Sequence, residues 1–314
     1  MNEPIHVVFW PYFEGLVDRV CLLELAFPRQ SSVWVNNFDD FHHDSGAVVI
    51  INGSVSYVPT MRELASLTKN FKWMLLVSIG DEGSGQHFEW IERPNISIWV
   101  QEPKPGVSGT LEPQGRGDGL LDHDKYHRMP VGPITRIFNM LPLVQNEMKE
   151  KPLDWFCSGS IRDVAWDKAT RALPVGRGNY FYSGHLSYED YARSLASAKI
   201  TVCRPTLTTP ETCRVYDALE AGCIPIVGTT PCGDGWFAKS ALNWSHYWEY
   251  VLGEKPPFPV IDGPDELAGA VKEVLDNWPE RSRIVSSWWK DYKIRLIHTL
   301  REEVETLRSS AIRR

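Results

Sequence analysis

The segment RPTLTTPETCRVYDALEAGCIPIVG, residues Arg204–Gly228, decides the fold of the second half of the chain. It follows an apolar, β-rich run at Ile200–Cys203, passes through a loop rich in hydroxyl groups, and continues into a helical pattern at Glu211–Ala221. Gly222 ends that helix, and a second apolar run follows at Cys223–Val227. Two apolar strands joined by one helix form a βαβ unit, and such units build parallel sheets covered by helices on both faces.

The same alternation of short apolar runs and helical patterns continues along the rest of the chain. Further strands are expected at Ile5–Phe9, Ser32–Val35, Ala47–Ile51, Trp73–Ser78, Ile96–Val100, Leu153–Cys157 and Tyr180–Tyr182. Helices are expected at Phe13–Ala26, Thr60–Asn70, Ile134–Glu150, Arg162–Leu173, Tyr188–Ala198 and Pro264–Trp278, and from about Glu280 to Arg308. The pattern predicts an α/β fold in which ligands bind outside the carboxyl ends of the strands.

The length of 314 residues suggests two domains. Lys151-Pro152 is a plausible linker, so we expect one domain over residues 1–150 and a second over residues 151–314. Between the two sets of strands, the Pro- and Gly-rich stretch Pro103–Pro133 reads as poorly structured. A functional loop, a lid and a disordered bridge are the alternatives for it.

Composition and charge exclude several classes of protein. The chain has 33 Lys and Arg against 40 Asp and Glu, a net charge of −7. Residues 1–150 hold 12 of the basic and 19 of the acidic residues, whereas residues 151–314 hold 21 of each, so the whole excess lies in the first half. An acidic first half argues against a protein whose main task is to bind phosphate backbones. The 13 Trp, 11 Tyr and 12 Phe exclude a largely disordered chain.

Apolar runs and cysteines indicate where the protein works. No apolar run approaches the ~20 residues of a membrane span, and the start MNEPIHVVFW does not resemble a signal peptide. Cys157, Cys203 and Cys223 lie in or beside apolar runs, where a thiol behaves as a small core residue. No cysteine spacing typical of zinc occurs. We therefore expect a reduced, cytoplasmic protein.

The start of the predicted helix at Glu211–Ala221 has the chemistry of an anion site. A helix N-terminus presents free N–H groups and a partial positive charge. Arg214 in the first turn adds a fork of donors that matches a phosphate. Asp217, about one turn further on, could accept from the two vicinal hydroxyls of a ribose. The alternative is an ordinary βαβ unit with an exposed Arg and Asp.

The run T-x-R-x-x-D-A-L-x-A-G-C-I-P-I-V at Thr212–Val227 resembles the donor-binding signature of the exostosin-like glycosyltransferases. Three further segments resemble the same family in the same order: KPLDWFCSGSIR at Lys151–Arg162, the helix and strand at His185–Pro205, and GWFAKSALNW at Gly235–Trp244. LLVSIGDEG at Leu75–Gly83 is a weaker match. The resemblance covers about residues 151–250 and little of the first half.

The resemblance implies a GT-B fold, in which two Rossmann-like domains with parallel sheets face a central cleft and the C-terminal helix crosses back to the first domain. By position, Arg214 would bind the donor diphosphate and Asp217 the ribose. Ser158, Gly159 and Thr212 would line the pyrophosphate, with Arg204 at the mouth. The resemblance implies a nucleoside-diphosphate sugar as donor, a UDP-linked one, with no metal and no further cofactor. One departure is Cys203-Arg204-Pro205-Thr206, where the family has Cys-Pro-x-Gly.

A catalytic base, where one is needed, should project from the first domain. Asp81 and Glu82 follow the predicted strand Trp73–Ser78 at its carboxyl end, and Glu102 is a second candidate. The alternative is a solvated turn, since Gly-Asp-Glu-Gly is ordinary turn chemistry.

Two groups of Asp and His residues resemble metal sites in their composition. They are Asp39, Asp40, His42, His43 and Asp44, and Asp122, His123, Asp124 and His127. Both follow or lie in loops without the helix that fixes His-x₃-His spacing, so solvated loops are expected rather than a metal.

These features predict a glycosyltransferase that moves a sugar from a nucleoside diphosphate to an acceptor hydroxyl. The acceptor is a glycan, a lipid-linked or small molecule, or a hydroxylated base in DNA, as in the DNA glycosyltransferases of phages. The stretch Pro103–Pro133 carries the basic residues Lys104, Arg116, Lys125 and Arg128, which could reach a DNA backbone. The alternative function is a non-catalytic, two-domain protein that binds a sugar nucleotide. A Rossmann-type oxidoreductase is disfavoured because no GxGxxG fingerprint is present.

Overall fold

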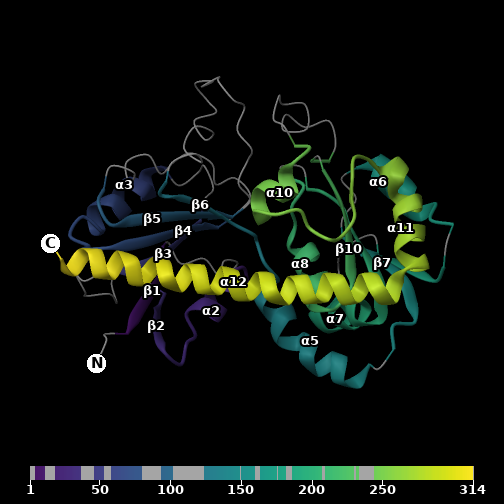
Figure 1. Ribbon diagram of the computed structural model, residues 1–314, viewed down its shortest axis with the longest axis horizontal. Helices are drawn as coiled ribbons and strands as arrows, with labels where there is room; N and C mark the ends of the chain where they lie inside the picture. Colours follow the sequence, from purple (N-terminus) through teal and green to yellow (C-terminus); the bar gives the residue numbers. More distant parts are fainter. Residues whose placement is uncertain are drawn as a thin grey trace. The chain divides into compact units, whose positions relative to one another are not determined.

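The computed structural model shows an α/β protein with two parallel sheets, as the sequence predicts (Figure 1). It describes residues 4–10, 18–36, 46–52, 58–79, 93–101, 124–148, 150–159, 163–174, 176–181, 186–206, 209–229, 231–232 and 244–313. The chain divides into two compact units, Met1–Pro130 with Lys293–Arg314, and Val131–Tyr292. The long helix α12 (Trp278–Ile312) contributes its first turns to the second unit and its last turns to the first.

The first unit is built on a six-stranded sheet in the order β2-β1-β3-β4-β5-β6, and every pair is parallel. Its strands are β1 (Ile5–Trp10), β2 (Ser32–Val35), β3 (Ala47–Asn52), β4 (Met74–Ile79), β5 (Ile96–Gln101) and β6 (Tyr126–Met129). Both faces of the sheet are covered, because alternate residues of a strand point to opposite sides and β4 and β5 are buried throughout.

Two groups of helices supply the cover of this first sheet. Leu64 of α3 (Val58–Leu67) packs into a core cluster with Val49, Leu76 and Ile98. Helix α2 (Cys21–Ala26) is held to the end of α12, where Arg301 Nε donates to the carbonyl oxygen of Ala26 at 2.7 Å.

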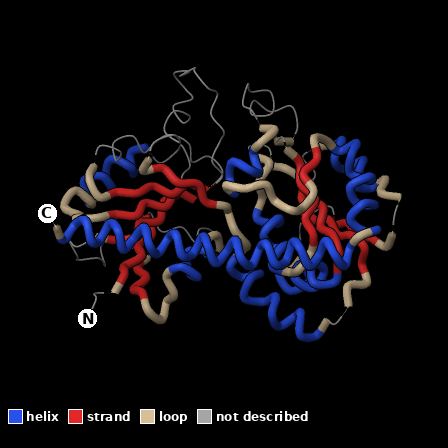
Figure 2. Tube along the Cα trace, viewed as in Figure 1, coloured by secondary structure: helices blue, strands red, loops and turns tan. Residues whose placement is uncertain are grey.

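The second unit carries a five-stranded parallel sheet in the order β11-β10-β9-β7-β8 (Figure 2). Its strands are β7 (Leu153–Ser158), β8 (Gly178–Phe181), β9 (Ala198–Cys203), β10 (Ile224–Gly228) and β11 (Val260–Ile261). Its helices, besides the start of α12, are α5 (Thr135–Glu147), α6 (Val164–Arg171), α7 (Tyr188–Ser197), α8 (Cys213–Glu220), α10 (Tyr247–Leu252) and α11 (Leu267–Asp276), the last preceded by a 3₁₀ turn at Pro264–Glu266.

Two helix layers cover the second sheet. Helix α11 contacts α6 as well as β9 and β10, and helix α5 contacts α7 and α8. Helix α5, which the sequence-based division places before the linker, therefore packs within the second unit.

The expected strands are present with their ends shifted by one or two residues, but β6, β11 and α10 were not expected. The prediction that Pro103–Pro133 lacks regular structure is wrong at Tyr126–Met129, which forms β6. This strand pairs in register with β5, from Ile98 opposite Tyr126 to Gln101 opposite Met129, and it buries the side chains of Tyr126 and Met129. Residues 103–123 of that stretch lie outside the described residues.

Two further expectations concern cysteines and membranes. All six cysteines are free, and Cys157, Cys203 and Cys223 are buried, as predicted for core residues. Among the described helices, none combines the length and the apolar composition needed to cross a bilayer.

Lys151 holds the ends of two helices to the start of β7. Its ammonium group donates to the carbonyl oxygens of Ala196, Ala198 and Ala221 at distances of 2.9 to 3.1 Å. These carbonyls lie at the C-terminal ends of α7 and α8, where a cation also interacts favourably with the helix dipole. The residue expected in a linker is thus an anchor of the second unit.

The substitution Lys151→Met should lower the free energy of unfolding by about 2 kcal/mol, because three carbonyl groups lose a charged donor. Lys168→Met, on the exposed face of α6, is the matched control and should change it by less than about 0.5 kcal/mol. Urea denaturation of both variants measures the difference. Equal stability of the two variants would contradict the anchoring role.

Candidate functional site

The order of strands reverses at the centre of the second sheet. From β7 the chain crosses to β8 on one side, and it then returns past β7 to β9 on the other. The loops that leave β7 and β9 diverge at this point, which is where doubly wound sheets bind their ligands. Ser158 ends β7 and Gly159 follows it, while Arg204 directly follows the last residue of β9. Ser158 and Gly159, which the resemblance assigns to the pyrophosphate, and Arg204, which it assigns to the mouth of the site, therefore lie at one edge of the sheet.

Arg214, in the first turn of α8, lies against the backbone of Gly159. A Cβ atom added to Gly159 would lie 2.7 Å from Nη2 of Arg214 and 2.9 Å from its Cζ. Gly159 also has a φ of +118°, which residues with a side chain rarely adopt. Glycine is required here both for the backbone conformation and for the close approach of the guanidinium group.

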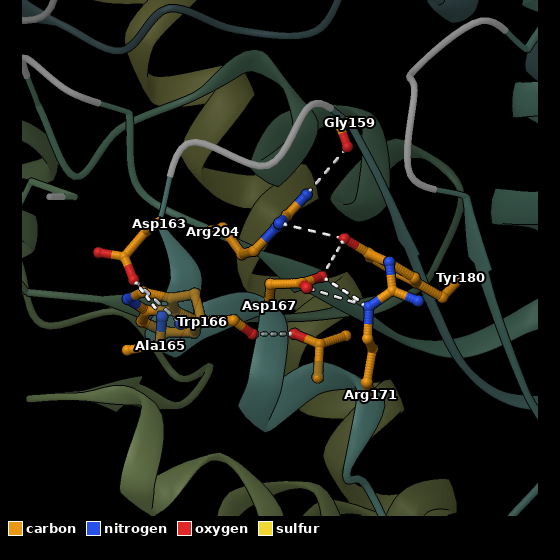
Figure 3. Close-up of polar contacts among 9 residues, drawn as sticks. Gly159, Asp163, Ala165, Trp166, Asp167, Arg171, Tyr180 and Arg204 are labelled. Atoms are coloured by element: carbon orange, nitrogen blue, oxygen red, sulfur yellow. Dashed lines mark hydrogen bonds and ion pairs between the residues drawn. The ribbon is translucent and has the colours of Figure 1, made fainter.

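Arg204 reaches the same glycine from the neighbouring strand. Its Nη2 donates to the carbonyl oxygen of Gly159 at 3.1 Å, and its Nη1 donates to the hydroxyl of Tyr180 at 3.3 Å (Figure 3). The residue is only 9% exposed. The guanidinium groups of Arg204 and Arg214 therefore both lie against Gly159.

Neither arginine forms an ion pair with a carboxylate of the described residues. Within that part of the chain, Arg204 donates to Gly159 and Tyr180 and also interacts with the thiol of Cys157, and Arg214 donates to the hydroxyl of Thr212 at 3.3 Å. Burial raises the pKa of the neighbouring Cys157 thiol to about 11, although both arginines act in the opposite direction, so the thiol is neutral. Because a buried charge without a counter-charge is costly, the site favours a bound anion.

Helix α8 adds to the positive potential at this edge. Its N-cap residue Thr212 is buried, with an extended backbone at φ −153° and ψ 146°. The Thr212 hydroxyl makes no capping bond to the helix and instead accepts from Arg214. The positive end of the helix dipole therefore lies beside the guanidinium group of Arg214.

Asp217 lies three residues after Arg214 on α8, and its carboxyl group is held inside the second unit. It is fully buried, and its two oxygens accept hydrogen bonds from the backbone N–H of Ile134 at 2.8 Å and from the hydroxyl of Tyr191 at 3.3 Å. Burial raises the pKa of this carboxyl group to about 7. In this arrangement the group ties α8 to the residue before α5, and its binding to a ribose stays a prediction.

Glu211 is a second buried carboxyl group that the sequence did not single out. Its Oε1 accepts from the backbone N–H of Val131 at 2.8 Å and from the hydroxyl of Tyr216, and its Oε2 accepts from the hydroxyl of Tyr247 at 2.9 Å. Burial raises the pKa of Glu211 to about 7. Two of its three partners, Val131 and Tyr247, are 80 and 36 residues away in the sequence, so no local pattern could reveal its full set of contacts.

Tyr180 is the other residue that sequence reasoning missed. It appeared only as part of an expected strand, and nothing local marks its contact with Arg204, which is 24 residues away.

The catalytic candidates of the first unit, Asp81, Glu82 and Glu102, lie outside the described residues. The same holds for most residues of the two clusters that resemble metal sites, namely Asp39, Asp40, His42, His43, Asp44, Asp122 and His123. Of the second cluster, Asp124 and His127 are described, and Asp124 is exposed. His127 stacks on Trp99 at a ring distance of 4.9 Å, and burial lowers the pKa of its imidazole. No group of three or more metal-binding side chains occurs in the part of the chain that the structure describes.

Comparison with protein-family models finds no match, and comparison with curated proteins finds none either.

The buried carboxyl group of Glu211 makes stability depend on pH. Its pKa is about 7 in the folded chain, above the ordinary value of 4.5, so the folded state holds a proton that the unfolded state has already lost. Stability should therefore fall as the pH rises from about 4.5 to about 7 and then level off. Glu211→Gln should remove about 3 kcal/mol of this fall.

Urea denaturation of the full chain at about pH 5 and about pH 8 measures that effect. The fall that remains in Glu211→Gln belongs to Asp217, whose pKa is raised in the same direction, and Asp217→Asn is the matched variant. An unchanged difference between the two pH values in Glu211→Gln would contradict the assignment.

Proposed function

We propose that the chain is a glycosyltransferase that moves a sugar from a nucleoside-diphosphate sugar, a UDP-linked one, to an acceptor hydroxyl. The observation that carries the proposal is that Arg204 and Arg214 both lie against Gly159, and that neither forms an ion pair with a carboxylate of the described residues. The resemblance of Thr212–Val227 to the donor-binding signature of exostosin-like glycosyltransferases supports it from the sequence.

A diphosphate suits this site for a simple electrostatic reason. It carries negative charge on two linked phosphates, and each guanidinium group presents a fork of donors that matches phosphate oxygens. Its charge rises further as the bond to the sugar breaks. Positive groups that are already in place stabilise such a developing charge without reorganisation. The two arginines and the N-terminus of α8 can therefore supply this stabilisation themselves, so the proposal requires no metal ion.

The remaining parts of the reaction fall to the first unit in this proposal. Asp81 or Glu82, which follow β4, would take the proton of the acceptor hydroxyl. The acceptor is a glycan, a small molecule or a hydroxylated base in DNA. A GT-B arrangement, with the donor in the second unit and the acceptor in the first, suits a chain whose last helix contributes to both units.

The substitution Arg214→Ala should weaken the binding of UDP by at least about tenfold, because one of the two guanidinium groups is lost. The melting temperature should stay the same or rise, since a half-buried cation without an ion pair is removed. Incubated with UDP-sugars without acceptor, the wild-type protein should slowly release UDP, and the variant should not. Calorimetry, thermal unfolding and a nucleotide assay measure the three effects.

Arg283→Ala is the control, because its side chain is 73% exposed on α12. It should bind UDP like the wild type. Unchanged UDP affinity in Arg214→Ala would refute the site. A wild-type protein that binds UDP-sugars but never releases UDP, with or without a candidate acceptor, would support the non-catalytic binding protein instead.

A further inference from the structure

Besides its contact with Gly159, Arg204 takes part in a chain of hydrogen bonds that links it through Tyr180 to Asp167 on α6. The hydroxyl of Tyr180 on β8 accepts from Nη1 of Arg204 at 3.3 Å and donates to Oδ1 of Asp167 on α6 at 2.8 Å (Figure 3). Nε of Arg171, one turn further along α6, donates to both oxygens of Asp167 at 3.0 and 3.1 Å. Tyr180 of β8 therefore contacts Arg204 directly, and α6 acts on Arg204 through Tyr180.

Each group in this chain is held in the protonation state that its contacts need. Burial, helped by the hydrogen bond to Asp167, raises the pKa of Tyr180 to about 12, so its hydroxyl keeps the proton that it donates. Partial burial disfavours the charge on Asp167, but the hydrogen bonds from Tyr180 and Arg171 outweigh it and lower the pKa of Asp167. The carboxylate thus remains a charged acceptor.

Tyr180 also restrains Arg204 through its ring. The Cζ atom of Arg204 lies 5.6 Å from the centre of the ring, and that of Arg171 lies 4.9 Å from it, within the range of cation–π attraction. Arg204 donates to the carbonyl oxygen of Gly159 and to the hydroxyl of Tyr180, and it also interacts with the buried thiol of Cys157. The hydrogen bonds to Gly159 and Tyr180 use two of the five N–H groups of a guanidinium.

The position of Tyr180 between Asp167 and Arg204 has an electrostatic consequence. A carboxylate in direct contact with Arg204 would form an ion pair and compete with any anion for the guanidinium group. A neutral hydroxyl between them fixes the orientation of the guanidinium group and leaves its charge for a ligand.

We propose that Tyr180 and Asp167 are positioning residues, which hold the guanidinium group of Arg204 beside Gly159 so that it binds the diphosphate of the donor. The proposal rests on the proposed function, because it assumes an anion at this edge of the sheet. It adds two residues outside the segments that resemble the glycosyltransferase signature at Thr212–Val227.

The test measures the binding of inorganic pyrophosphate to the full chain by calorimetry. Tyr180→Phe keeps the ring and removes the hydroxyl, and it should weaken binding by about tenfold. Tyr188→Phe is the matched control, because Tyr188 on α7 is partly exposed, and it should leave the affinity unchanged. Asp167→Asn keeps the size of the side chain and should weaken binding by about threefold, because the hydroxyl loses its charged acceptor.

A structural role alone is separated from positioning by a double-mutant cycle. If Tyr180 acts through Arg204, then adding Tyr180→Phe to Arg204→Gln should change the affinity by less than about twofold. The same holds for adding Asp167→Asn to that background.

Three results would overturn the proposal. Unchanged affinity in Tyr180→Phe, or an equal loss in the wild-type and Arg204→Gln backgrounds, would refute the positioning role while leaving the anion site intact. A wild-type protein that does not bind pyrophosphate would refute the anion site and the proposed function together with it.

Discussion

Two guanidinium groups lie against a single glycine, and the arrangement of the second unit follows from that contact. Arg204 arrives from the end of β9 and donates to the carbonyl oxygen of Gly159, and Arg214 arrives from the start of α8 and fills the space that a side chain at Gly159 would need. The strand order that places β7 beside β9 brings the two chain segments to the same edge. Asp167 and Asp217 offset part of this positive charge from a distance, and without a direct ion pair the two arginines favour a bound anion.

Acidic groups near this edge are kept out of direct contact with the two arginines. Asp167 is separated from Arg204 by the hydroxyl of Tyr180. Asp217 and Glu211 are turned inward, where they accept hydrogen bonds from the backbone N–H groups of Ile134 and Val131. The two buried carboxyl groups thereby fix the first residues of the second unit against α8, while the arginines remain available. The second half of the sequence has equal numbers of acidic and basic residues, so its net charge gives no sign that the acidic groups are held apart from the two arginines.

The sequence predicts the fold well because its strands are apolar on both faces. Ala47–Ile51 and Ile200–Cys203 are continuous apolar runs, and these are typical of buried parallel strands. It fails at β6, where His127 and Arg128 interrupt the apolar pattern and the pairing with β5 supplies what local sequence lacks. It also misreads Lys151, since a lysine before a proline gives no sign of the three carbonyl groups that surround it.

The site is predicted in part, for reasons of the same kind. A helical pattern places Arg214 and Asp217 about one turn apart, but it does not tell which side chain points inward. The donors that hold Asp217, the N–H of Ile134 and the hydroxyl of Tyr191, are 83 and 26 residues away. The sequence likewise gave no indication that Tyr180 contacts Arg204.

The most direct measurement of the central claim is a crystal structure of the protein with UDP. We predict that the diphosphate lies within hydrogen-bonding distance of both Arg204 and Arg214, beside Gly159. A diphosphate bound elsewhere, or in contact with neither arginine, would contradict the account.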